Sequence, residues 1–237
     1  ALPLFLVAKT ALLDSDINPA IGTSMALALF RLCFLIMLER TLEAFMKGAF
    51  GVQLKRVAFM DHAIKSLGLL LVFAYWMPPI VQASLALPLA TLLMVRWCYW
   101  HPAKALRRID IGVMYLGYLA IIVNLLLQAA ASLYGWGNSV AVHVFTLGTI
   151  GLIAPAMIVR ISNGHTGRKV QFGVIDKFAI MLMIAALIFR IGAPFFLPLF
   201  YTTWLYASAA CWFVAFTVIG YRYIPMLLAP RIDGRTH

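Results

Sequence analysis

Long apolar runs recur along the whole chain and are separated by short polar stretches. Each run is about twenty residues long, which is the length an α-helix needs to cross a bilayer. A transmembrane barrel would instead show short segments in which apolar and polar residues alternate. The pattern therefore predicts seven transmembrane helices, at residues 20–37, 63–80, 83–100, 111–131, 140–159, 175–193 and 199–219.

Two further segments are partly apolar but do not fit a complete span. Residues 1–13 are apolar but too short, since they would form only about 20 Å of helix; we interpret them as the end of a truncated span. Residues 39–61 are too polar to cross a bilayer. Within them, four apolar residues share one helical face, which predicts an amphipathic helix on the cytoplasmic membrane surface: Phe45, Met46, Ala49 and Phe50.

Composition agrees with a membrane protein. The chain is 64% hydrophobic and 11% charged, whereas soluble domains are closer to half apolar and a quarter charged. No low-complexity stretch marks a boundary between domains. We predict an all-α, polytopic transmembrane helix bundle that forms a single domain over residues 1–237.

The basic residues are distributed unevenly between the two ends of the spans. Sixteen of the nineteen fall at or near the connections that follow the first, third, fifth and seventh spans; the exceptions are Lys9, Arg31 and Arg190. The positive-inside rule makes this side cytoplasmic, together with the C-terminus. Anionic lipid on that face is the expected partner. Nucleic acid is not, because the charge is divided among several loops and no recognition module is visible.

The span at 140–159 carries a histidine, His143, near its outer end. Several small residues follow it at Gly148, Thr149, Gly151 and Ala154. Such a slim helix with an imidazole is what a haem pocket needs, with a ligand for the iron and room for the macrocycle. The alternative is close helix packing with His143 hydrogen-bonded at an interface. Residue types alone favour the packing.

The polar stretch after this span raises a second question. Asn163 and Gly164 predict the end of the helix, because both tolerate a left-handed conformation, and Arg160 and Arg168 suit its negative pole. Neither argument accounts for His165, which is either a ligand for copper or iron or a solvated loop residue. His143 lies 22 residues earlier, about 33 Å away along a helix, so the two cannot share one metal ion.

Two arginines lie inside apolar runs, Arg31 in the first predicted span and Arg190 in the sixth. An arginine at membrane depth usually faces a polar interior or an anionic group, such as a haem propionate. The alternative is that its side chain reaches out to the interface. Polar residues of the span at 111–131 either line the same interior or form hydrogen bonds between helices: Tyr115, Tyr118, Asn124 and Gln128.

The sequence HVFTLGTIGLIAPAMIVRISNGHTGR, at residues 143–168, closely resembles the signature of the NnrS family. These are bacterial inner-membrane proteins that contain haem and copper and are linked to nitric oxide metabolism. ERTLEAFMKGAF, at 39–50, and PRID, at 230–233, are similar more loosely. The resemblance covers most of the chain, which corresponds to the C-terminal part of a family member with about twelve spans. Tyr115 stands where the family usually has a histidine.

The resemblance implies a haem-binding, and also copper-binding, inner-membrane protein of the nitric oxide or nitrosative-stress response. The implied cofactors are haem b and copper. The residues expected at these sites are His143, Arg31, Arg190, Arg160, Arg168 and Tyr115 for haem, with His143 and His165 as metal ligands. No catalytic acid, base or nucleophile is assigned. Two alternatives stay open: an accessory subunit that has lost its cofactors and works with partner chains in a membrane complex, and a transporter.

Overall fold

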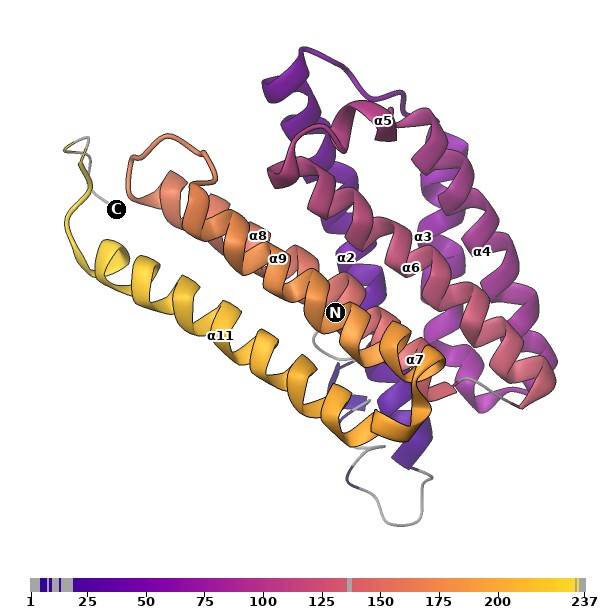
Figure 1. Ribbon diagram of the computed structural model, residues 1–237. Coiled ribbons are helices and arrows are strands. Elements are labelled where there is room, and N and C mark those ends of the chain that lie inside the picture. The colour runs from indigo at the N-terminus through magenta and orange to yellow at the C-terminus, as the bar shows by residue number, and fades with distance from the viewer. Residues whose placement is uncertain are drawn as a thin grey trace. The chain divides into compact units, whose positions relative to one another are not determined.

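The structure is a computed structural model that describes residues 5–7, 9, 13, 19–135, 138–232 and 234 (Figure 1). These residues form helices and connections and contain no strand. Seven helical stretches in them are long and apolar enough to cross a membrane: Ile21–Phe50, Ala58–Trp76, Pro79–Tyr99, Ile109–Tyr134, Ser139–His165, Val174–Phe196 and Pro198–Leu228. The seven predicted spans and the polytopic helical bundle are confirmed. The predicted truncated span at residues 1–13 falls mostly outside the described residues.

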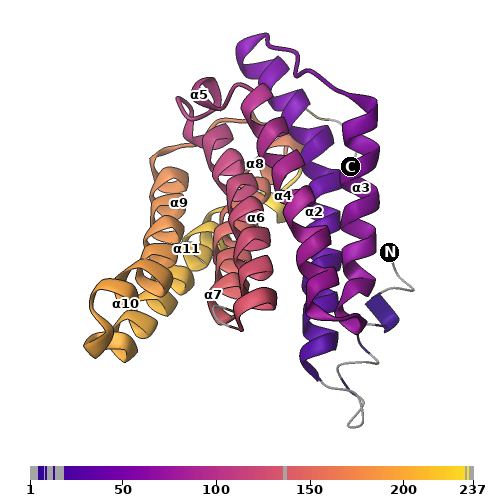
Figure 2. The same cartoon turned by 90° about the vertical axis from the view of Figure 1, so that its right-hand side faces the viewer.

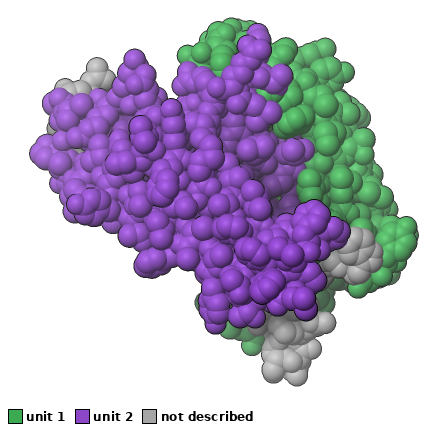
Figure 3. Space-filling view, in the orientation of Figure 1, with its two compact units in different colours: residues 1–102, 121–142 green, residues 103–120, 143–237 purple. Residues whose placement is uncertain are grey.

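The chain divides into two compact units, which Figure 3 shows in different colours. Unit 1 comprises Ala1–Pro102 and Ile121–Val142, and unit 2 comprises Ala103–Ala120 and His143–His237. Helix α6 (Ile109–Tyr134) therefore contributes its first part to unit 2 and its second part to unit 1. One continuous helix belongs to both units, and this is compatible with a single domain. The single domain stays a prediction.

Unit 1 is built on α2 (Pro19–Phe50), α3 (Ala58–Phe73) and α4 (Pro79–Tyr99), with the short turn η1 (Ala74–Trp76) between the last two. The second part of α6 and the start of α7 (Asn138–His143) complete it. Helix α2 packs against α3, and α3 packs against α4 (Figure 2). One face of α2 is buried at helical spacing: Met25, Ala28, Leu29, Leu35, Leu38, Leu42 and Met46.

The structure corrects the predicted amphipathic surface helix. Residues 39–50 continue α2 without a break, and Gly51, with φ +65°, follows its last residue. Leu42 and Met46 are fully buried, so the apolar face of this segment packs against protein. An apolar face at helical spacing looks the same in the sequence whether lipid or protein covers it. No proline interrupts the segment either, and the helix therefore continues.

Unit 2 is built on α8 (Gly151–His165), α9 (Val174–Leu187) and α11 (Tyr201–Leu228), together with the first part of α6 and the short α5 (Pro102–Ala105) at its beginning. Helix α9 packs along α11, and α8 contacts both (Figure 1). Two stretches of π-helix interrupt the spans: η2 (Val144–Ile150) precedes α8, and η3 (Ile188–Gly192) follows α9. The short α10 (Ala193–Phe196) and η4 (Pro198–Phe200) lead into α11.

One arrangement of charges occurs three times in the described residues. Helices α3, α6 and α9 each begin with an aspartate in the first turn, and an arginine from the C-terminal part of the next span binds it. The pairs are Asp61 with Arg96 at 3.4 Å, Asp110 with Arg160 at 2.8 Å, and Asp176 with Arg222 at 3.6 Å. Each aspartate lies at the positive pole of its helix, which favours its charge.

Candidate functional site

The predicted site residues His143 and Arg190 lie together in unit 2. His143 is the last residue of α7, directly before the π-helix η2, and Arg190 belongs to the π-helix η3. The Nε2 atom of His143 and the Nη2 atom of Arg190 are 2.7 Å apart. π-Helical turns are rare and often occur at functional sites. This pair, brought together by two of them, is the best candidate for a binding site in unit 2.

The chemistry of the pair fixes the state of the imidazole. A guanidinium only donates hydrogen bonds, so Nε2 of His143 accepts from Arg190, and the ring is neutral with its proton on Nδ1. Arg190 also donates through Nη1 to the Tyr201 hydroxyl at 3.1 Å. Among the described residues, no carboxylate forms an ion pair with Arg190. The half-buried cation thus has neutral partners and retains the capacity to bind an anionic group.

The small residues after His143 serve close helix packing. A Cβ atom added at Gly148 would lie 2.9 Å from the Ala120 side chain, and one at Gly151 would lie 3.0 Å from that of Met183. In α6, a Cβ at Gly117 would lie 2.4 Å from Ile153. The faces of these glycines are therefore occupied by neighbouring side chains. This is the packing alternative, and it leaves no room for a macrocycle against Gly148 and Gly151.

The end of this span differs from the prediction. Helix α8 continues through Asn163 and Gly164 to His165, and Gly167 takes the left-handed conformation, with φ +72°. The N–H of Arg168 donates to the Asn163 carbonyl at 2.9 Å, and the N–H of Gly167 donates to that of Gly164 at 3.2 Å. These two bonds form a Schellman motif. The predicted stop at Asn163 and Gly164 is therefore wrong, and Gly167 ends the helix.

The Asn163 side chain explains why the helix does not stop there. It is buried and donates to the Val159 carbonyl at 2.9 Å and to the Tyr223 hydroxyl at 3.2 Å. The Tyr223 hydroxyl in turn donates to Asp176 at 3.0 Å. Asn163 therefore links α8 to α11 and, through Tyr223, to α9. A partner 60 positions away in the chain gave no signal in the sequence.

The remaining predicted residues of this region lie apart from the pair. Arg160 is bound to Asp110 at 2.8 Å, so it joins α8 to α6. The same carboxylate accepts two hydrogen bonds from Arg108, which raise the pKa of that guanidinium above its ordinary value. His165 is exposed in the last turn of α8. The described residues contain no group of three His, Cys, Asp or Glu side chains that could hold a metal ion.

Arg31 lies in unit 1 and faces a polar interior, as predicted. Its side chain is buried, and Nη1 donates to Asn124 at 2.8 Å and to Gln128 at 2.9 Å. Because the guanidinium is buried, the alternative in which it reaches out to the interface is wrong. Tyr115 is fully buried as well, in the part of α6 that belongs to unit 2.

The sequence analysis missed a buried ion network in unit 1. Arg96, which counted there as a cytoplasmic surface charge, is fully buried, and its Nη1 lies 3.6 Å from Glu39 and 3.4 Å from Asp61. Glu39 also binds Lys65, at 2.9 Å, and Arg56. The available signal was the scarcity of acids. The chain has eight, and four of the five that the structure describes are buried, namely Glu39, Asp61, Asp110 and Asp176.

Comparisons with known proteins identify the family. The family model described as NnrS protein matches residues 1–231, which include the segment 143–168 and parts of both units. No curated protein and no solved structure matches the chain. With a family match over nearly its whole length and seven membrane-spanning helices, the chain belongs to the NnrS family.

Proposed function

We propose that this chain is a haem-binding protein of the bacterial inner membrane, in which His143 would hold the iron of haem b and Arg190 would bind a propionate. Family membership supports the coarser statement, an NnrS-like membrane protein of nitric oxide metabolism. The observation that carries the haem proposal is the contact between His143 and Arg190 at 2.7 Å. When bound, the haem supplies an iron centre that takes up a diatomic gas or an electron.

The two side chains match the two ends of a haem. The iron needs an imidazole nitrogen, and the neutral ring of His143 has a lone pair on Nε2. A propionate needs a cation, and Arg190 has no carboxylate partner among the described residues. The macrocycle would have to lie away from Gly148 and Gly151, because neighbouring side chains fill the space beside both.

Binding through Nε2 requires Arg190 to give up its hydrogen bond, since that nitrogen has one lone pair. The iron would take the position beside Nε2 that Nη2 now occupies, so the guanidinium would have to move away; the Tyr201 hydroxyl, bound to Nη1, is a partner that it could keep. His143 and Arg190 lie at π-helical turns, next to η2 and within η3, and such turns are frequent at functional sites. His143 therefore acts as the ligand, and Arg190 as a positioning residue before binding and a propionate partner afterwards.

The visible spectrum of the purified protein tests this proposal. We expect a Soret band and, after reduction, the α and β bands of a b-type haem. A colourless protein that copurifies in fixed proportion with other chains would contradict it and would support the accessory-subunit alternative. Tyr115, buried where the family usually has a histidine, favours that alternative.

Copper at His165 is the less supported part of the proposal. Imidazole suits copper, and His165 is exposed and accessible. A complete copper site needs further ligands, and the described residues do not gather three candidate side chains at any point. We therefore assign His165 a single ligand role, with the rest of the coordination supplied from outside the described residues.

A further inference from the structure

A buried positive charge in unit 1 lacks a negative partner. Arg31 is 2% exposed and lies within the span Ile21–Phe50. Its hydrogen-bond acceptors, Asn124 and Gln128, are both neutral amides. Its Nη2 atom is buried without a hydrogen-bond partner in the described residues. No carboxylate of those residues forms an ion pair with it, whereas buried Arg96 has two.

An arginine side chain in a protein always stays protonated, so the charge of Arg31 cannot be removed by the loss of a proton. An uncompensated buried charge is strongly unfavourable, and arginines at this depth pair with anions or face water. The two amide oxygens solvate Nη1 but carry no net charge. The missing partner is therefore an anion that comes from outside the described residues.

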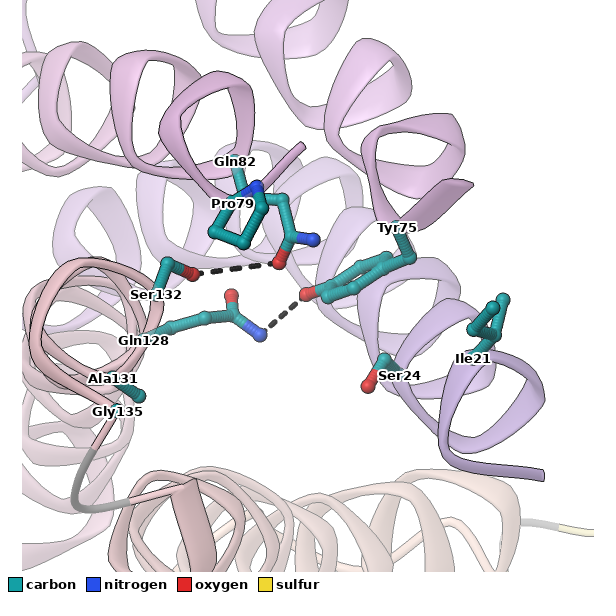
Figure 4. Close-up of a pocket in the computed structure, with 9 residues that line it drawn as sticks. All are labelled: Ile21, Ser24, Tyr75, Pro79, Gln82, Gln128, Ala131, Ser132 and Gly135. Atoms are coloured by element: carbon teal, nitrogen blue, oxygen red, sulfur yellow. Dashed lines mark hydrogen bonds between the residues drawn. The ribbon is translucent and has the colours of Figure 1, made fainter. Parts of the chain in front are cut away.

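A site for such an anion lies on the far side of Gln128 from Arg31. Unit 1 contains a cavity of about 410 Å³ between α2, η1, α4 and α6. Gln128 lines the cavity and connects it to Arg31, because its Oε1 accepts from the guanidinium while its Nε2 donates to the Tyr75 hydroxyl (Figure 4). Ser24 lines it from α2, seven positions before Arg31 and thus on the same helical face, about 10 Å away.

The lining of the cavity suits a small anion. The polar side chains around it are hydroxyls and amides, at Ser24, Tyr75, Gln82, Gln128 and Ser132 (Figure 4). None of the described residues that line it is charged, so Arg31 behind Gln128 is the nearest source of charge that the hydrogen bonds identify. Hydroxyl and amide groups can donate hydrogen bonds to the oxygens of an oxoanion, and the single positive charge behind Gln128 calls for a single negative one.

We propose that this cavity binds a small monovalent oxoanion of the nitrate and nitrite class, whose charge compensates that of Arg31 across Gln128. Gln128 is the positioning residue, because its amide both holds the guanidinium and forms the cavity wall. The site uses no residue of the His143 and Arg190 pair and lies in the other unit. The anion proposal therefore does not depend on haem binding.

Thermal stability with nitrate as the probe tests the proposal. The protein in detergent is heated in sodium nitrate or in sodium gluconate of equal ionic strength, and the surviving monodisperse protein is measured by size-exclusion chromatography. At ten times the dissociation constant, we expect nitrate to raise the midpoint by roughly 3–6 °C. Equal midpoints in the two salts would overturn the proposal, and an equal rise with chloride would overturn the oxoanion class.

The variant Gln128→Glu places a fixed carboxylate against Arg31. It should raise the midpoint in gluconate and abolish the response to nitrate, because the internal carboxylate takes the place of the anion. Gln53→Glu is the matched control, since Gln53 is exposed in the connection between α2 and α3. It should leave both values unchanged. If Gln128→Glu keeps the full nitrate response, Arg31 is not the binding group.

A haem propionate or a lipid headgroup would offer Arg31 the same chemistry as a free oxoanion. His143→Gln separates these sources, because by the proposed function it lacks haem. We expect its nitrate response to equal that of the unmodified chain, in delipidated as well as lipid-containing preparations. A response that appears or grows only when haem or lipid is removed would show that one of them occupies the site in the unmodified chain and would overturn the free-anion assignment.

Discussion

At the scale of single residues, the informative contrast is between arginines with and without acidic partners. Arg96, Arg160 and Arg222 each bind an aspartate and hold two helices together. Arg31 and Arg190, the two that lie deep in predicted spans, are instead held by neutral side chains. The charges of the structural cations are thus compensated by acids of the fold, while these two retain the capacity to bind an external anion. This difference underlies both proposed sites.

The role of His165 can be tested against its own loop. His165 and Lys169 are both exposed beyond or at the end of α8, so replacing either with glutamine removes a polar loop group at little structural cost. If His165 is a copper ligand, His165→Gln should lose copper, and Lys169→Gln should keep it, as measured by elemental analysis. Equal copper content and equal stability in the two variants would make His165 a solvated residue.

At the scale of elements, the sequence predicted the spans, whose length depends on bilayer thickness. It missed the features that depend on which residues pack against one another. The seven spans follow from the length of the apolar runs. The continuation of α2 to Phe50 does not, because burial of Leu42 and Met46 against protein leaves the same periodicity as contact with lipid. The pairing of His143 with Arg190 does not follow from the apolar runs either. The two residues are 47 positions apart and are brought together by π-helical turns, which the sequence did not predict.

The glycines Gly164 and Gly167 give a matched test of where α8 ends. Gly167 has φ +72°, so Gly167→Ala should destabilise the protein by about 1–2 kcal/mol. Gly164 is helical with open space around it, so Gly164→Ala should stabilise it by about 0.5–1 kcal/mol. Thermal or denaturant unfolding of the two variants measures the difference. Opposite signs would mean that Gly164, as predicted from the sequence, ends the helix.

At the scale of the whole molecule, the distribution of charge and apolar surface describes a membrane protein. In the last span, Pro198–Leu228, only 17% of the apolar 18-residue stretch is buried, and large side chains such as Tyr206, Phe213 and Leu228 are exposed. Exposed apolar surface of this extent needs a lipid or protein cover. The basic connections favour one orientation, with the C-terminus and the connection between α8 and α9 in the cytoplasm and facing anionic lipid.

Cysteine labelling tests that orientation. Lys104 in α5 and Arg168 after α8 belong to connections predicted to be cytoplasmic. We replace Cys33, Cys98 and Cys211, then introduce Lys104→Cys or Arg168→Cys. Each new thiol should be protected in intact cells from a reagent that does not cross the membrane and should react after lysis. Labelling of either one from outside would reverse or refute the topology.

The central claim is that His143 holds a haem, and the haem content of His143→Gln tests it most directly. Glutamine keeps an oxygen that can accept the hydrogen bond from Arg190, so the packing of η2 and η3 should survive, but it does not replace imidazole as an iron ligand. His62→Gln is the control, because His62 is exposed at the start of α3. We predict that His143→Gln inserts and folds normally yet loses most of its haem, while His62→Gln retains it. Haem content in well-folded His143→Gln equal to that of the unmodified chain would contradict the account.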